Sequence, residues 1–160
     1  VYYGDNTDYL ELDTTIATTD DIAVWNDTSP TATVFTVGTE DMVNKSGTSY
    51  IACLFATLDG VSKVGTYTAD ATLTTIDCGF TTGARFILIK RTDSTGDWYQ
   101  YGYTQGIVAG NDPYMRPNVA ATQVTGTDYI DPDNSGFQIT AAGSSTINVS
   151  GGTYIYLAIA

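Results

Sequence analysis

The chain is divided into short apolar or alternating runs, and no stretch of a dozen residues shows a helical period. Turn residues separate the runs, as at Asp59-Gly60 and Asp133-Asn134-Ser135-Gly136. Thr and Tyr, which are abundant here, favour pleated, half-buried surfaces. The pattern predicts an all-β fold, an antiparallel β-sandwich or jelly-roll-like arrangement with about a dozen strands. The expected strands are Tyr9–Leu12, Ile22–Trp25, Thr33–Val37, Tyr50–Leu58, Val61–Thr68, Leu73–Ile76, Ala84–Lys90, Trp98–Tyr103, Phe137–Ile139, Thr146–Val149 and Tyr154–Ile159.

One of these runs differs from the others in its lack of alternation. Arg85–Lys90 is apolar at every internal position and has a cation at each end. A strand that is apolar on both faces is covered on both sides. We therefore expect this segment to be a central strand.

The sequence also contains an internal similarity. Ser46–Ala56 is repeated in modified form as Ser150–Ala160, and Asn6–Leu10 similarly resembles Asn111–Met115. Phe35-Thr36-Val37 matches Phe137-Gln138-Ile139 in the same order. The paired segments lie roughly 100 residues apart, a period that is typical of tandem structural modules. Chance resemblance is the alternative, because Gly, Thr and Tyr are common throughout the chain.

The similarity divides the chain into one and a half modules. Residues 57–160 would be a complete β-sandwich module, and residues 1–56 only the later half of another. Residues 1–56 contain no counterpart of Val61–Tyr103, the part of the complete module that holds the most hydrophobic strands. The chain would then be cut from a longer polypeptide, or the half-module would complete its sheet with another subunit. We therefore expect a homo-oligomer.

Charge and composition exclude several functions. The chain has 6 basic and 18 acidic residues and a net charge of −12, which disfavours binding to nucleic acid. It contains no histidine, so Ser-His and Cys-His nucleophile systems and His-ligated metals are excluded. No apolar run approaches the ~18 residues of a membrane span. Paired aspartates could cleave a glycosidic bond, but no spacing nominates a pair, and we expect neither an enzyme nor a cofactor.

The best candidate binding residues lie on the run Trp98–Tyr103. Alternation places Tyr99, Tyr101 and Tyr103 on one face and Trp98 on the other. Tyrosine rings can stack on sugars while their hydroxyls form hydrogen bonds, so these four residues are candidate glycan contacts. The alternative is that one face belongs to the core and the other to the surface or a subunit contact.

Asp131 and Asp133 begin a segment that looks like the first half of a calcium loop. The bidentate acid that an EF-hand needs at its twelfth position is replaced by Ala142. We treat both aspartates as weak metal candidates and expect an Asx-type turn before Phe137 instead. The two cysteines, Cys53 and Cys78, are expected to be buried free thiols. A disulfide between them is the alternative.

Several segments resemble a known but uncharacterised domain. It recurs near the carboxyl end of long structural proteins of marine tailed phages. The resemblance covers roughly residues 47–160 and implies a virion component, most plausibly tail-fibre-like, with a natural carboxyl terminus near Ala160. It implies no active site. The segments that carry it are Val61–Thr68, Ile76–Phe80, Gly83–Asp93, Gly96–Tyr99, Gly110–Tyr114, Thr127–Pro132 and Gly151–Ala160.

Two hypotheses about function follow from these observations. In the first, the chain is a structural or adhesive virion module that assembles with itself and with other virion proteins. Many weak contacts with a host-surface glycan would then add up through multivalency. In the second, it is a subunit of a bacterial extracellular filament or adhesin, located at the cell surface, and its half-module accepts a strand from a neighbour.

Overall fold

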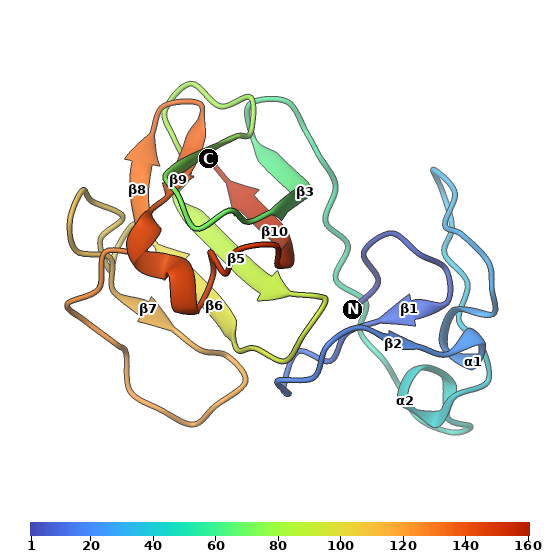
Figure 1. The fold of residues 1–160 in the computed structure, drawn as a ribbon. Coiled ribbons are helices and arrows are strands. Elements are labelled where there is room, and N and C mark those ends of the chain that lie inside the picture. Colours follow the sequence, from blue (N-terminus) through green and yellow to red (C-terminus); the bar gives the residue numbers. More distant parts are fainter.

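The computed structural model describes residues 1–160, and two antiparallel sheets face each other within residues 62–159 (Figure 1). The larger sheet has the strand order β3 (Ser62–Thr68), β10 (Thr153–Ile159), β5 (Phe86–Arg91), β6 (Trp98–Gly102) and β7 (Tyr114–Met115). The smaller sheet has the order β4 (Thr74–Asp77), β9 (Gly136–Ile139) and β8 (Ile130–Asp133). The prediction of an all-β antiparallel sandwich is confirmed.

The last strand of the chain lies inside the larger sheet. β10 pairs along its whole length with β3, from Thr153 opposite Thr68 to Ile159 opposite Ser62. On its other side it pairs with β5, where Leu157 lies opposite Leu88. The segment expected to be central, Arg85–Lys90, largely coincides with β5, which is the third of five strands.

Seventeen buried residues from both sheets form the hydrophobic core. Ile87, Ile89 and Ala158 of the larger sheet are completely shielded from solvent, as are Phe137 and Ile139 of the smaller one. The remaining members are Ala69, Ile76, Cys78, Phe80, Ala84, Tyr101, Ile107, Tyr114, Ile130, Ile147, Tyr154 and Tyr156.

Aromatic side chains make up a large part of this core. The rings of Tyr67 and Tyr154 stack with their centroids 4.9 Å apart, and both hydroxyls donate to backbone carbonyls near Ile147. Tyr156 lies across Gly65 of the neighbouring strand, where a Cβ atom would come within 2.6 Å of the tyrosine hydroxyl. Gly65 is therefore required for close packing of this ring on β3.

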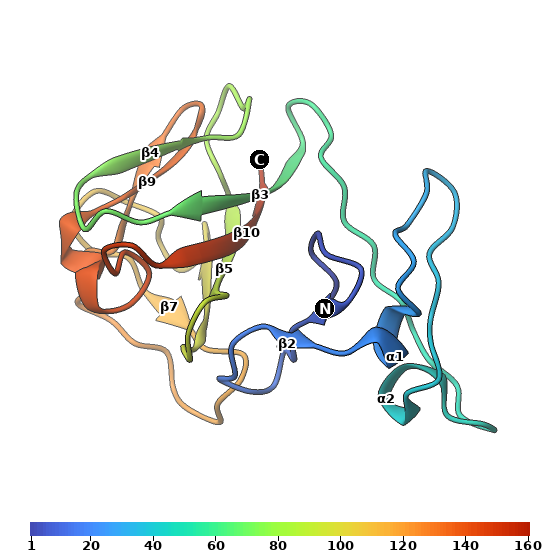
Figure 2. The ribbon, with the colours of Figure 1, turned by 45° about the vertical axis from the view of Figure 1, so that its right-hand side comes forward.

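Residues 1–56 form a separate, sparsely structured segment beside the sandwich (Figures 1 and 2). It contains the short strands β1 (Asp8–Tyr9) and β2 (Thr19–Asp20), which pair with each other, and the one-turn helices α1 (Ile22–Trp25) and α2 (Asp41–Asn44). No helix of the protein has both the length and the apolar character needed to cross a membrane.

Polar contacts attach this segment to the loop between β5 and β6. The Trp98 indole donates to the carbonyl of Glu11 at 2.9 Å. The buried Lys90 ammonium donates to the carbonyls of Gly96 at 2.7 Å and Thr15 at 3.3 Å. The amino-terminal segment thus covers one end of β5 and β6.

Several expected strands are not strands in the structure. Ile22–Trp25 is helix α1, because the Asp21 carboxylate caps it by accepting from the Ala23 N–H. Thr33–Val37 and Tyr50–Leu58 have no strand structure beyond one bridge at Leu58, since no neighbouring strand runs beside them. Residues 146–149 are irregular and follow the 3₁₀ helix η1 (Ala141–Ser145).

The two halves of the internal similarity have different structures. Ser150–Ala160 contains β10, whereas residues 47–56 are exposed and unpaired. The reason is that β10 has β3 and β5 as neighbours, while the first segment has no counterparts of those strands. Residues 1–56 consequently do not form half of a second sandwich.

The two cysteines are not bonded to each other. Cys78 is buried, as expected, and this burial raises its pKa to about 11. Cys53 is exposed, contrary to expectation, because the segment that carries it has no covering layer.

A buried carboxylate organises the loop before β8. Asp112 is fully shielded and accepts from the backbone N–H groups of Val108 at 3.2 Å and Ile130 at 3.1 Å. Burial raises its pKa to about 6; the two N–H donors oppose this shift, and the charges of Asp128 and Asp131 add to it.

We expect Asp112 to make stability depend on pH. Its pKa is higher in the folded state than the ordinary 3.8, so the folded state binds this proton more tightly. The contribution of this proton to the free energy of unfolding is fully present below about pH 4. It is lost as the pH rises through about 6. The loss amounts to about 2–3 kcal/mol.

Urea unfolding of the wild type and of Asp112→Asn between pH 4 and 7 measures this effect. The free energy of unfolding of the wild type, minus that of the variant, should fall as the pH rises. A difference that stays constant over this range would contradict the assignment.

A second prediction concerns Tyr101, which is fully buried and whose hydroxyl has no hydrogen-bond partner. Tyr101→Phe keeps the ring and removes the unsatisfied hydroxyl, so it should raise the free energy of unfolding by about 1 kcal/mol. Tyr101→Ala should lower it by about 3–5 kcal/mol through cavity formation. Denaturant unfolding measures both variants, and a clear loss of stability in Tyr101→Phe would refute this reading of the hydroxyl.

Candidate functional site

Arg85 and Tyr103 lie side by side at the ends of two adjacent strands. Arg85 precedes β5, Tyr103 follows β6, and the Tyr103 N–H donates to the Arg85 carbonyl at 2.7 Å. The Arg85 N–H in turn donates to the carbonyl of Ile159. The central carbon of the guanidinium is 4.9 Å from the centroid of the Tyr103 ring, within the range of a cation–π contact. The backbone of the larger sheet therefore fixes the base of both side chains.

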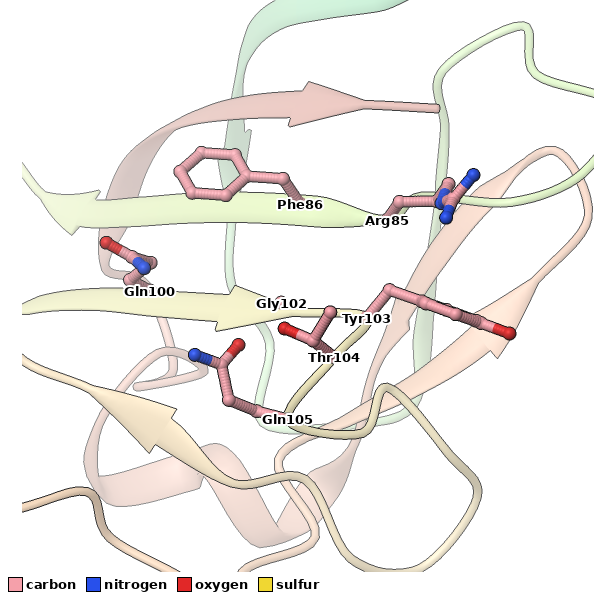
Figure 3. Close-up of a pocket in the computed structure, with 7 residues that line it drawn as sticks. All are labelled: Arg85, Phe86, Gln100, Gly102, Tyr103, Thr104 and Gln105. Atoms are coloured by element: carbon pink, nitrogen blue, oxygen red, sulfur yellow. The ribbon is translucent and has the colours of Figure 1, made fainter.

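Two open hollows adjoin this pair. The first has a volume of about 330 Å³ and is lined by Arg85, Phe86, Gln100, Gly102, Tyr103, Thr104 and Gln105 (Figure 3). The second has a volume of about 530 Å³ and is lined by Thr82, Gly83, Ala84, Arg85, Tyr103, Ile107, Pro132, Asp133 and Asn134. Arg85 and Tyr103 belong to both, so a ligand in either hollow would meet them.

The Gln105 side chain comes close to the backbone of β6. A Cβ atom at Gly102 would lie 2.2 Å from the Gln105 amide oxygen, so a larger residue there would displace this carboxamide. The backbone N–H of Gln105 donates to the Gly102 carbonyl in the turn that follows β6. The turn thus places Gln105 in the lining of the first hollow, to which Gln100 also contributes (Figure 3).

Arg85 differs from the other arginines in its electrostatic surroundings. Arg91 pairs with Asp93 at 2.9 Å and Arg116 with Asp97 at 2.8 Å. Arg85 is exposed and takes part in none of the three salt bridges of the protein. Its guanidinium N–H groups remain free to donate to oxygen atoms of a ligand.

The arrangement offers three kinds of contact to a polar ring compound. The Tyr103 side chain is 62% exposed and presents an aromatic face. Arg85 and the two glutamine carboxamides supply hydrogen-bond donors and acceptors. This set of groups suits the binding of a sugar, whose ring stacks on an aromatic face while its hydroxyls form hydrogen bonds.

Of the four predicted glycan contacts, two are buried, one is half-buried and one, Tyr103, is exposed. Tyr101 is completely buried and Trp98 is 2% exposed, so both predictions are wrong. Tyr99 is half-buried, with its ring centroid 5.2 Å from that of Tyr114. The smaller sheet covers the face that carries Tyr101, and the amino-terminal segment covers Trp98. Tyr103 remains exposed to solvent because it lies beyond the end of β6.

The carboxylates of Asp131 and Asp133 have different surroundings in the β8–β9 hairpin. The Asp133 carboxylate accepts from the N–H and the hydroxyl of Ser135 at 2.8 and 2.7 Å, which confirms the predicted turn. One carboxylate oxygen of Asp131 is buried without a partner. No group of three or more acidic, thiol or imidazole side chains is arranged to hold a metal ion.

Arg85 and Gln105 were not identified from the sequence as site residues. In the sequence, Arg85 stands out only as the charge at one end of a hydrophobic strand. The pairing of β5 with β6, in which Phe86 lies opposite Gly102, brings these positions together. A polar residue beyond the end of each strand of a hairpin is the one feature that could have indicated this site.

Comparison with known proteins gives a family but no function. Searches of the curated proteins and of the solved structures found no match. The profile of a domain of unknown function, DUF7483, matches residues 2–160, which include both the amino-terminal segment and the sandwich. Because the match extends over nearly the whole sequence, the chain belongs to the DUF7483 family.

Proposed function

We propose that this chain is a structural module of a phage particle, tail-fibre-like and exposed on the virion, that contacts a glycan of the host surface. The resemblance of residues 47–160 to carboxyl-terminal domains of phage structural proteins supports the virion context. The observation that carries the glycan contact is the exposed Tyr103–Arg85 pair between two open hollows.

The contact would be weak in each copy and useful in many. A single exposed ring and a few hydrogen bonds bury little area, and both hollows are open to solvent. Repetition of the module in one particle would convert weak sites into high avidity. The partners of the chain are then further copies of itself, other virion proteins and a surface polysaccharide.

The rigidity of the sandwich fits this role. Arg85 is joined to the start of β5 and Tyr103 to the end of β6, and the neighbouring strands β10 and β7 hold these two strands in the larger sheet. Because the backbone on which this pair stands is already ordered, binding of a ligand would have to order only the two side chains. Binding and structural strength can therefore reside in the same small module.

A bacterial extracellular filament or adhesin subunit is the second candidate. The observation that favours it is the outer edge of β3, which has no strand partner. An open edge can accept a strand from a neighbouring subunit, as in assembly by strand addition.

The glycan contact predicts the effect of two substitutions on binding to immobilised bacterial surface polysaccharides. Tyr103→Ala and Arg85→Ala should each lower the affinity for a bound polysaccharide about tenfold, through loss of stacking and of hydrogen-bond donors. Tyr103→Phe should keep most of the affinity. The melting temperature should stay unchanged, because both side chains are exposed.

Leu73→Ala, at an equally exposed position outside the hollows, is the matched control. The proposal fails if no polysaccharide binds to the wild type. It also fails if Tyr103→Ala binds as tightly as the control.

A further inference from the structure

The segment between α2 and β3 is apolar and almost entirely exposed. Residues 49–57 form no hydrogen bond between backbone groups. Ile51 is 94% exposed, Leu54 76% and Phe55 59%. Figures 1 and 2 show the segment as an extended connection between α2 and β3 with no strand beside it. Such a contiguous apolar surface is rare on a monomeric protein.

This segment leads directly into the open edge of the larger sheet. Leu58 and Ser62 exchange two backbone hydrogen bonds, both 2.9 Å long, and the Thr57 hydroxyl contacts the backbone of Val64. The residues that precede Ala56 lie away from this edge. The strand β3 itself pairs only with β10, on its inner side. Edge strands with unpaired N–H and C=O groups are sites at which another chain can pair.

The charge distribution favours a second copy at this surface. Two copies that each carry a net charge of −12 repel one another wherever their acidic surfaces meet. Residues 46–62 contain a single charged residue, Asp59, and Lys45 and Lys63 flank them. This surface is therefore locally free of the repulsion that opposes self-association elsewhere.

The exposed area is of the size that a stable interface needs. With about 150–250 Å² for a fully exposed aromatic side chain, and less for an aliphatic one, the apolar residues of this surface expose at most on the order of 800 Å². That value is close to the ~800 Å² that each partner contributes to a standard interface. The residues are Tyr50, Ile51, Leu54, Phe55, Leu58, Val61 and Val64.

We propose that residues 50–64 are a self-association surface, which meets the same surface of a second copy of this chain. Apolar side chains supply the driving force, and the free edge of β3 supplies backbone hydrogen bonds. The inference deepens the assembly part of the proposed function and does not depend on the glycan contact.

Light scattering coupled to size-exclusion chromatography, over a dilution series, tests the association. The wild type should show at least twice the chain mass of 17.0 kDa. Leu54→Asp places a charge in the surface and should shift the protein to the monomer. Leu73→Asp, at a similarly exposed leucine outside the surface, should leave the oligomer unchanged. Circular dichroism should show that both variants are folded, because both leucines are exposed.

Cys53 allows the interface to be located directly. It is exposed within the segment, whereas Cys78 is buried, so a bismaleimide should react at Cys53 alone. Wild type and Leu73→Asp should form a covalent dimer, and Leu54→Asp and Cys53→Ser should not. A wild-type monomer, or an oligomer that Leu54→Asp leaves intact, would overturn the proposal.

The glycan contact is measured separately. The Leu54→Asp monomer should retain the single-site affinity for a polysaccharide and lose only avidity. Failure of self-association with intact polysaccharide binding would leave the glycan contact standing, and the reverse result would leave the association surface standing.

Discussion

The position of β10 between β3 and β5 is the constraint on which the rest of the structure depends. Along the chain, β3 and β5 are the first two strands of the larger sheet, and β4, which lies between them in sequence, belongs to the smaller sheet. β3 and β5 do not pair with each other, and the carboxyl-terminal strand β10 lies between them and pairs with both. Because this pairing joins residues 62–68 to residues 153–159, the sheet depends on contacts of long sequence separation. Deletion of the last strand would remove both its pairings and the aromatic packing of Tyr154 and Tyr156.

Buried polar side chains hold the connections between strands in place. The Asn148 carboxamide accepts from the Ala71 N–H and donates to the carbonyls of Thr72 and Thr140, which joins two loops to η1. Asp112 joins the loop after β6 to β8, and Lys90 joins the amino-terminal segment to β5. Each of these groups forms hydrogen bonds with backbone atoms of the connecting segments. The loops that surround the sandwich are therefore ordered by side chains from its interior.

The two functional surfaces proposed for the chain lie at the same end of the larger sheet, where Ser62 of β3, Ile159 of β10 and Phe86 of β5 are aligned across the strands, but they use different parts of it. Arg85 and Tyr103 are at strand ends in the β5–β6 pair, whereas the apolar segment leads into the β3 edge. Strand ends and sheet edges are the places where a sandwich presents groups that are not committed to its core.

Local pattern determined the class of fold and the positions of most of the sandwich strands, but it did not identify β7 or β8. Alternation and turn residues were sufficient for β3, β5, β6, β9 and β10, because those segments carry the side chains that fill a two-sheet core. The same pattern in Tyr50–Leu58 gave no strand, since strand formation needs a neighbour and not only a propensity. Only the tertiary structure decided that Tyr101 is buried and Tyr103 exposed: alternation predicts one face for both, but Tyr101 lies within β6 in the core, whereas Tyr103 lies in the turn beyond the end of that strand.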